Sequence, residues 1–245
     1  MDGTHRGVPT VDDDERTRAD AAIQRSVELT RIPRHVGVIP DGNRRWADAR
    51  GLARADGYFP GVDRGLHFLE VCRGLGIAEV SVYGFTKENV RRPAEQVAVF
   101  RRACTEFGLK AIERGVALRA LGDTRSPVFP EALLPYAERR SAGDLRMNLL
   151  VNYGWQWDLA WGSEQASRTR DFSSSQAPLA LASADIPRVD LVVRWGGRRR
   201  LSGFLPVQCA YADFYVIDTL WPEATPEEFL DALAWYEEQD STLGG

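Results

Sequence analysis

The feature that most constrains this chain is a repeated succession of short apolar runs, each ending in a loop rich in glycine and polar residues. His35–Ile39 is the first run, and it stops at the turn-forming cluster Pro40-Asp41-Gly42-Asn43. Segments with helical spacing separate the runs, and strands that alternate with helices form parallel sheets. We therefore expect an α/β fold, a single domain with a mainly parallel central sheet flanked by helices, whose ligands bind beyond the carboxyl ends of the strands.

The expected elements follow from apolar spacing and from glycine or proline at the segment ends. Residues 1–32 are expected to form an acidic tail with a possible short helix near Ala21–Thr30, ahead of a catalytic domain over residues 33–245. Segment 163–185 is rich in Ser and Ala and is expected to be a loop or a weak helix. The other expected strands are Val80–Tyr83, Val116–Leu121, Leu145–Val151, Val189–Val193 and Tyr211–Asp218, and the expected helices are Val62–Leu75, Ala94–Arg114, Pro130–Arg140 and Pro226–Glu238.

Composition narrows the classes of function. The net charge of −4 and the pI near 5.5 argue against a mainly electrostatic nucleic-acid binder. No apolar stretch is long enough to cross a bilayer, and three isolated cysteines fit a reducing compartment, so a cytoplasmic protein without stable membrane insertion is expected. The absence of GxGxxG, GxxxxGK[ST] and GxSxG leaves nicotinamide binding, a P-loop and serine hydrolysis without support.

The loop Asp41–Trp46 has the residue types of a diphosphate site. Glycine lets the backbone approach a ligand, and a helix beginning near Arg44 would direct free N–H groups at an anion, to which Arg44 and Arg45 add positive charge. Asp41 would repel a diphosphate unless a divalent cation lies between them, so we infer Mg²⁺. The alternative is that Asp41 only caps the helix in a tight turn.

Residues 194–202 form a second candidate anion site. Four arginines within seven residues repel one another unless an anion binds or acidic residues neutralise them, and Gly196 and Gly197 leave backbone N–H groups open to a phosphate. A solvated surface charge run is the alternative, although Phe204 and Leu205 would draw this loop onto the core. Residues 87–92 form a third polar loop with a less specific pattern.

Six ordered blocks of the sequence resemble the signature blocks of the cis-prenyltransferases, the undecaprenyl diphosphate synthase family. They are HVGVIPDGNRRW (35–46), YGFTKENVRRP (83–93), NYG (152–154), DLVVRWGGRRRLS (190–202), YADFY (211–215) and LWP (220–222). The resemblance runs from about residue 33 to residue 239. It implies a homodimeric α/β fold with a hydrophobic tunnel, dependence on Mg²⁺, and condensation of isopentenyl diphosphate with an allylic diphosphate.

The resemblance also implies roles for individual residues. The implied catalytic residues are Asp41, Asn43 and Asn89, and the implied metal ligands are Asp41 and Asp213. The implied diphosphate-binding residues are Gly42, Arg44, Arg45, Arg54, Arg92, Arg194, Arg200 and Ser202. The implied pocket residues are Trp46, Tyr58, Phe85, Thr86 and Val90.

The sequence departs from the family pattern around the reacting carbons, while the groups implied for diphosphate and metal persist. Pro40, Arg44, Tyr58, Lys87, Val90, Arg198, Gly203 and Asp213 stand where the family usually has Met, Gly, His, Ser, Trp, Glu, Asn and Glu, and Trp155-Gln156 replaces a Gly-Arg pair.

Such changes favour an irregular product, because small displacements of the reactants change which carbon attacks. We expect a branched or cyclised diphosphate of roughly two or three isoprene units, made head-to-middle from dimethylallyl diphosphate as in lavandulyl-type synthases. A regular enzyme that elongates an allylic diphosphate with isopentenyl diphosphate is one alternative. A non-catalytic partner subunit is another, against which the presence of Asp41 argues.

Overall fold

Parallel strands form one sheet in the order β3-β4-β2-β1-β5-β6 within the part of the chain that the computed structural model describes, residues 29–170, 173 and 178–239. The strands are β1 (His35–Ile39), β2 (Glu79–Thr86), β3 (Val116–Leu121), β4 (Leu145–Tyr153), β5 (Leu191–Arg194) and β6 (Asp213–Val216). Every neighbouring pair is parallel. The expected parallel α/β sheet is therefore confirmed.

Strand β1 lies in the middle of this sheet and is buried along its whole length. Val36 pairs with Val80 of β2 on one side and with Leu191 of β5 on the other. The chain first builds the sheet on the β2 side of β1 and then crosses to the β5 side. The loops that follow β1 and β5 therefore meet at one edge, at a point where the strand order reverses, which is the usual ligand position in such sheets.

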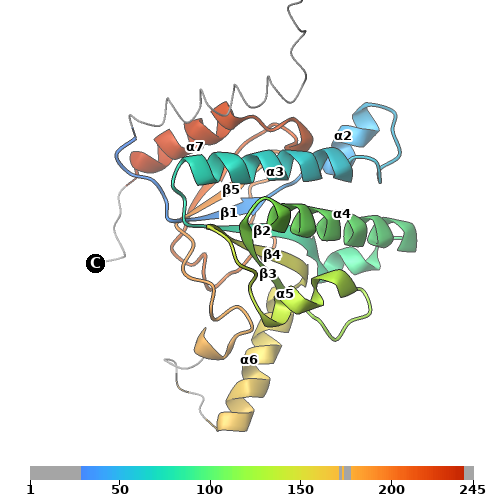
Figure 1. The fold of residues 1–245 in the computed structure, drawn as a ribbon, viewed down its shortest axis with the longest axis vertical. Coiled ribbons are helices and arrows are strands. Elements are labelled where there is room, and N and C mark those ends of the chain that lie inside the picture. Colours follow the sequence, from blue (N-terminus) through green and yellow to red (C-terminus); the bar gives the residue numbers. More distant parts are fainter. Residues whose placement is uncertain (1–28, 171–172, 174–177, 240–245) are drawn as a thin grey trace, which may run out of the picture.

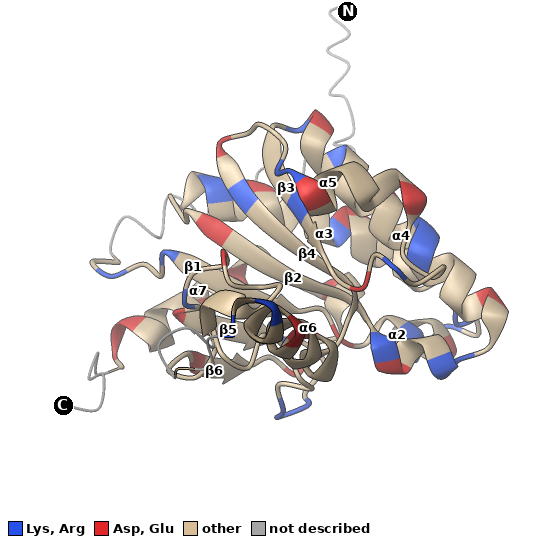
Figure 2. Ribbon diagram, turned by 90° about the horizontal axis from the view of Figure 1, so that it is seen from below, with Lys and Arg blue, Asp and Glu red and all other residues tan. Residues whose placement is uncertain are grey.

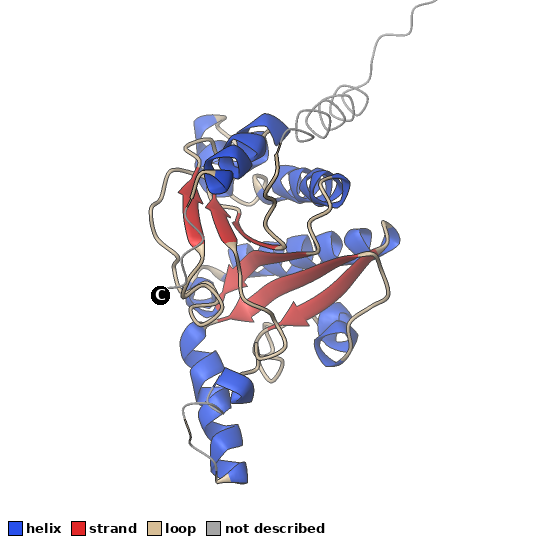
Figure 3. Cartoon of the chain, turned by 90° about the vertical axis from the view of Figure 1, so that its left-hand side faces the viewer, coloured by secondary structure: helices blue, strands red, loops and turns tan. Residues whose placement is uncertain are grey.

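Helices lie on both sides of the sheet (Figures 1 and 3). They are α2 (Asn43–Ala49), α3 (Tyr58–Gly74), α4 (Ala94–Glu113), α5 (Leu134–Glu138), α6 (Trp155–Thr169) and α7 (Pro226–Glu237), with 3₁₀ turns η2 (Lys87–Arg91), η3 (Glu131–Leu133), η4 (Pro178–Ala180) and η5 (Trp221–Glu223). Helices α3, α4 and α7 cover one face, and α6 extends away from the other (Figure 1).

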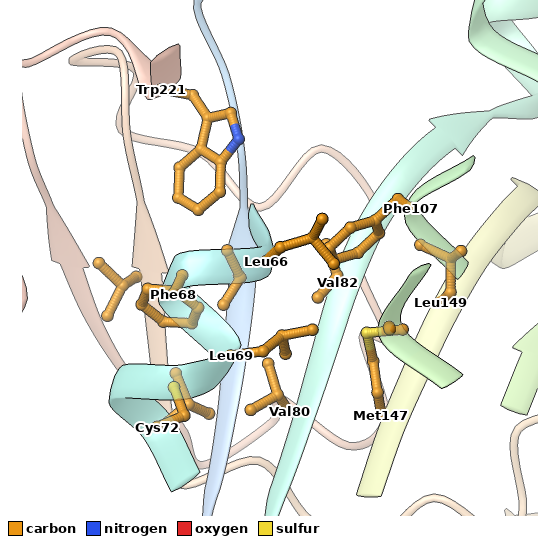
Figure 4. Packing of buried hydrophobic residues seen from close by; sticks show 14 of the residues in the cluster. Leu66, Phe68, Leu69, Cys72, Val80, Val82, Phe107, Met147, Leu149 and Trp221 are labelled. Atoms are coloured by element: carbon orange, nitrogen blue, oxygen red, sulfur yellow. The ribbon is translucent and has the colours of Figure 1, made fainter. Parts of the chain in front are cut away.

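Alternating strand side chains supply two apolar cores, one on each face of the sheet. On β5, Leu191 and Val193 join the core beneath α3, α4 and α7, whereas Val192 joins the core on the opposite face. Figure 4 shows the larger core, in which Leu66 and Leu69 of α3 point toward the strand residues. Because both faces are covered, the strands are continuously apolar, which is why the sequence shows runs rather than alternation.

Strands β2, β4, β5 and β6 differ from the expected strands by up to three residues at an end, and the helices differ clearly in three places. Helix α3 begins at Tyr58 rather than Val62, because proline is tolerated in a first helical turn. The helix expected over Pro130–Arg140 is a 3₁₀ turn followed by the five residues of α5. Helix α6 was not expected, and it runs into the segment 163–185 as far as Thr169. The helix expected near Ala21–Thr30 lies almost entirely outside the described residues.

Among residues 29–170, 173 and 178–239, no helix is long and apolar enough to span a membrane.

Candidate active site

A cavity of about 720 Å³ opens at the carboxyl edge of the sheet and continues between α3 and α4. Its polar end is formed by the loops that follow β1, β2 and β5, and its apolar end by side chains of the two helices. All three polar loops identified in the sequence contribute to this one cavity. The parallel arrangement explains why, since the carboxyl ends of the strands share an edge.

Asp41 and Arg194 form an ion pair at the centre of the polar end. Arg194 Nη2 donates to Asp41 Oδ2 at 2.8 Å, and Arg194 Nη1 donates to Ser202 Oγ at 2.9 Å and to the Arg200 carbonyl. The sheet register brings them together, because Ile39 at the end of β1 pairs with Arg194 at the end of β5. Only 5% of the Arg194 side chain is exposed, so the guanidinium is a fixed centre of positive charge.

Gly42, not Asp41, occupies the N-cap of α2. The φ of Gly42 is +114°, a conformation that side-chain-bearing residues rarely adopt, and a Cβ there would lie 2.8 Å from Leu220 Cδ2. The Asp41 carboxylate instead faces Arg194 and, at 3.5 Å, Arg45. The alternative of Asp41 as a helix cap is therefore not observed.

Asn43 presents an unsatisfied acceptor in the cavity wall. Its Nδ2 donates to the Pro40 carbonyl at 3.2 Å, whereas its buried Oδ1 has no hydrogen-bond partner among the described residues. The neighbouring Gly61 of α3 leaves room for this oxygen, since a Cβ at Gly61 would lie 2.4 Å from it. A buried acceptor without a partner costs free energy, so this atom is suited to receive a donor from a ligand or a water molecule.

Positive charge exceeds negative charge around the cavity, which is lined by six arginines and three carboxylates. Arg45 Nη2 donates to the Gly196 carbonyl at 2.8 Å, which connects the first loop to the third. The N–H groups of Gly196 and Gly197 donate to backbone carbonyls, so the expectation that they are open to a phosphate is wrong. Within the described residues, Arg44, Arg198 and Arg200 form no ion pair, although each lines the cavity. Figure 2 shows basic and acidic residues side by side on α2. The excess charge favours a ligand with several negative charges.

Tyr58 and Arg92 lie where the polar and apolar ends meet. Arg92 Nη1 donates to Tyr58 Oη at 3.4 Å, and both side chains pack on the Phe100 ring. Burial raises the pKa of Tyr58, although the nearby Arg92 and Arg44 oppose the shift. Burial also lowers the pKa of Arg92. The phenol therefore keeps its proton and can donate it in a hydrogen bond to a ligand.

The η2 loop is held in place by hydrogen bonds between its own residues and by an ion pair. Thr86 N donates to Asn89 Oδ1 and Asn89 N donates to Thr86 Oγ1, each at 3.2 Å, which forms a capping box. Lys87 forms an ion pair with Asp123 in the loop after β3. These contacts fix the Asn89 amide, whose Nδ2 has no partner among the described residues and remains available as a donor.

The apolar end is closed where α3 meets α4. Gly65 of α3 faces the Phe107 ring of α4, since a Cβ at Gly65 would lie 2.8 Å from Phe107 Cε2. Figure 4 shows Phe107 beside Val82 and Leu149. The other apolar residues that line this end are Val62, Phe100, Ala103 and Cys104. Such a wall excludes water from a hydrocarbon chain and from a reactive cation.

Most of the residues expected at the site line this cavity, and some do not. Those that line it are Asp41, Gly42, Asn43, Arg44, Arg45, Tyr58, Thr86, Asn89, Arg92, Arg194, Arg200 and Ser202. Four others lie beside it: Arg54 pairs with Asp48, Trp46 lies under Arg50, Phe85 is buried against Phe100, and Val90 packs on the core. Asp48, Glu88 and, apart from Tyr58, the wall residues of α3 and α4 were not expected from the sequence.

Asp213 lies at the opposite edge of the sheet. It begins β6 and pairs with Leu191 at the start of β5, whereas Asp41 follows the end of β1. In parallel strands the first residues and the last residues lie at opposite edges. Within one chain Asp213 is therefore not brought to the cavity that contains Asp41.

The residues present fit a metal held jointly with a substrate. Among the described residues, no group of three or more His, Cys, Asp or Glu side chains could hold an ion by itself. Mg²⁺ commonly binds through one or two carboxylates together with substrate phosphates. Asp41, with about a third of its side chain exposed beside six cavity arginines, is such a carboxylate.

Comparison with known proteins gives the family. Residues 39–244 match the family model described as "Putative undecaprenyl diphosphate synthase". The chain is 35% identical to a ditrans,polycis-undecaprenyl-diphosphate synthase of Pseudomonas putida, over 87% of this chain and 91% of that protein. It is 33% identical to an isoprenyl transferase of Heliobacterium mobile, over 94% and 95% of the two chains.

Solved structures agree with the observed fold. A probable undecaprenyl diphosphate synthase from Campylobacter jejuni superposes with a TM-score of 0.71 at 26% identity, over 88% of this chain and all of that one. Lavandulyl diphosphate synthase from Lavandula x intermedia, solved with dimethylallyl diphosphate, has the same fold with a TM-score of 0.77 at 24% identity, over 87% of this chain and 98% of that one. With the matching family model and relatives, these findings establish that the chain belongs to the undecaprenyl diphosphate synthase (cis-prenyltransferase) family and is a prenyl-transferring enzyme that makes a prenyl diphosphate.

Proposed function

We propose that this enzyme joins short prenyl diphosphates, with dimethylallyl diphosphate as the allylic substrate, into a branched or cyclised product of the lavandulyl type. The size of the cavity, which is closed at its apolar end, carries this proposal. Its volume of about 720 Å³ includes both the polar and the apolar end, and it falls in the range of about 300–1,000 Å³ typical of small-molecule sites. Phe107 against Gly65 limits the length of chain that the apolar end can hold.

The two diphosphates would occupy the two arginine-rich loops. The allylic diphosphate would bind Asn43, Arg44 and Arg45. Arg54 would contribute indirectly, through its ion pair with Asp48, which lines the cavity. The second diphosphate would bind Arg194, Arg200 and Ser202, which already lie within hydrogen-bonding contact of one another. Each charge-assisted contact of this kind contributes about 1.5–3 kcal/mol.

The chemistry is ionisation followed by carbon–carbon bond formation. The allylic C–O bond breaks and its electron pair leaves with the diphosphate, which the arginines around Arg44 stabilise as charge develops. The double bond of the second substrate attacks the allylic carbon, and a proton is then lost from the product. The wall around Val62, Phe100 and Phe107 keeps water from the cation. Mg²⁺ held by Asp41 would supply further positive charge to the departing diphosphate.

The position of Asp213 supports a homodimer. This carboxylate could take part in metal binding only at the site of a second copy, because its own cavity lies at the other edge of the sheet. Exposed apolar side chains such as Leu179 and Tyr211 offer surface that association would bury. We further propose a cytoplasmic location, in keeping with three buried cysteines that are all free thiols.

The regular reaction is the second candidate, favoured by relatives named as undecaprenyl-diphosphate synthases specific for farnesyl diphosphate. It would use the same two diphosphate positions and add isopentenyl diphosphate to an allylic substrate. The difference between the candidates lies in which carbon of the second substrate attacks, which depends on placement within about 3–3.5 Å of the allylic carbon.

Product analysis separates the candidates. The purified enzyme is incubated with Mg²⁺ and dimethylallyl diphosphate, with and without isopentenyl diphosphate, and the dephosphorylated products are identified by mass spectrometry and NMR. A branched or cyclic product supports the proposal. Linear products that elongate only with isopentenyl diphosphate would assign the regular reaction, and no product under any condition would leave the partner-subunit alternative. Light scattering after size exclusion tests the homodimer.

A further inference from the structure

The loop that carries Arg200 and Ser202 is held in an unusual backbone shape. Ser202 and Gly203 are both left-handed, with φ of +53° and +77°, and Leu205 also has a positive φ. A serine rarely adopts this conformation by itself, so tertiary contacts must hold it there. Three such contacts come from different parts of the fold.

Two of the contacts are hydrogen bonds from side chains of the sheet, Arg194 of β5 and Tyr83 of β2. Arg194 donates to Ser202 Oγ and to the Arg200 carbonyl. Tyr83 Oη donates to the Ser202 carbonyl at 3.1 Å, and burial raises the pKa of Tyr83, so this donor keeps its proton. Both supports belong to the cavity already described.

The third contact is made by the indole ring of Trp155, which occupies the space that a side chain at residue 203 would need. A Cβ at Gly203 would lie 2.5 Å from Trp155 Cδ1, nearer than nonbonded atoms approach. Trp155 is the first residue of α6, and 40% of its surface remains exposed. The indole therefore lies directly on the bare backbone of Gly203, and a side chain at residue 203 would require the indole or the loop to move.

The same turn contacts the η2 loop. Gly154, immediately before Trp155, faces the Lys87 side chain, since a Cβ at Gly154 would lie 3.4 Å from three carbons of that chain. The start of α6 thus lies between the loop of Asn89 and the loop of Arg200. Its position affects both loops, and the contact on Gly203 is the tighter of the two.

We propose that Trp155 is a positioning residue that sets where the second diphosphate binds, by holding the Arg200–Gly203 loop through its contact with Gly203. The inference rests on the proposed function, because it assigns the second diphosphate to Arg194, Arg200 and Ser202. Trp155 does not itself line the cavity and acts through the loop. It therefore governs the affinity and placement of one substrate, whereas the allylic site around Arg44 is supported by other contacts.

The test uses Gly203→Asn, Trp155→Ala and the double variant. Asparagine tolerates the left-handed region better than other side chains, so Gly203→Asn adds the steric conflict with the indole at little cost in backbone strain. Trp161→Ala is the matched control, because Trp161 lies on the same helix and packs on Trp157 instead. Isopentenyl diphosphate is titrated calorimetrically into each variant, because its diphosphate is not attached to an allylic carbon and therefore does not ionise. The binding heat that is lost in Arg200→Ala is assigned to the second site.

Gly203→Asn is expected to weaken isopentenyl diphosphate binding by about tenfold. Trp155→Ala is expected to weaken the same binding by roughly threefold, because the loop loses a support. The double variant is expected to bind more tightly than Gly203→Asn alone, since removal of the indole relieves the conflict. Trp161→Ala is expected to match the wild type.

Two results would overturn the inference while leaving the proposed function intact: wild-type affinity in Gly203→Asn, or a double variant no better than Gly203→Asn. If Gly203→Asn fails to fold, equal affinities of Trp155→Ala and Trp161→Ala for isopentenyl diphosphate would also overturn the inference. A wild-type enzyme that neither binds isopentenyl diphosphate nor forms product would overturn the proposed function itself, and this inference with it.

Discussion

Replacing Arg194 by alanine is expected to weaken both the fold and the binding of diphosphate, whereas Arg200→Ala should weaken binding alone. Arg194 is 5% exposed and donates to Asp41, to Ser202 and to the Arg200 carbonyl. The Arg200 side chain is exposed at the cavity and forms no ion pair with the described residues. The two arginines thus line one cavity but differ in what they support.

The size of the effect follows from these contacts. Loss of one partner of a buried ion pair costs about 3–5 kcal/mol, because the other charge is left without compensation. The Asp41 side chain is 32% exposed, so water can solvate it and the lower end applies, about 3 kcal/mol. For a domain of this size that corresponds to a fall in Tm of roughly 6–12 °C. Arg200→Ala should change the free energy of unfolding by no more than about 0.5 kcal/mol.

Urea unfolding followed by circular dichroism gives the free energy of unfolding, and calorimetric titration with isopentenyl diphosphate gives the affinity of the folded protein. Both variants should bind about tenfold or more weakly than the wild type, which corresponds to one lost charge-assisted contact. Equal free energies of unfolding for the two variants would show that Arg194 does not organise the edge of the sheet, and the argument from burial would fail.

Three further predictions concern single residues. Asp41→Asn should remove most turnover, and added Mg²⁺ should no longer stimulate the residual rate, while circular dichroism stays unchanged; near-normal activity would exclude the metal role. Gly61→Ala should raise the KM of the allylic substrate and destabilise the fold by about 1–3 kcal/mol, because its Cβ would lie 2.4 Å from Asn43 Oδ1; wild-type values in both assays would contradict this. Burial lowers the pKa of His35, so the unfolded chain binds a proton more readily than the folded chain does. The free energy of unfolding should therefore decrease as the pH is lowered through about 6.5, by at most about 1.4 kcal/mol per pH unit. His35→Gln should lose that part of the pH dependence in urea unfolding, and an unchanged slope would show that another group is responsible.

The polar half of the site was predictable because its signal is local. Glycines beside arginines at a strand end are the residue types that bind an anion, and Asp41, Gly42 and Arg194 could be identified from that pattern. Strands β1 and β3 run over the expected residues for a similar reason, since each is an apolar run between turn-forming residues.

The apolar half could not be predicted in the same way. Gly65 and Phe107 look like ordinary core positions in their helices, and only the packing of α3 on α4 shows that they close a cavity. Helix α6 was missed because it begins with two tryptophans, Trp155 and Trp157, and is separated from β4 by Gly154 alone, without a polar cluster. The location of Asp213 depends on strand direction, which a motif does not specify.

The pairing of β1 with β5 also determines when the site can exist during synthesis. Asp41 and Arg194 are separated by 153 positions along the chain. At a translation rate of about 5–20 residues per second, roughly 8–30 s pass between the emergence of the two residues from the ribosome. During that time one edge of the central strand has no neighbour, and an unpaired strand edge is prone to wrong association. Folding of this enzyme should therefore be slow and late, with substrate binding acquired only after β5 and the loop that carries Ser202 have been made.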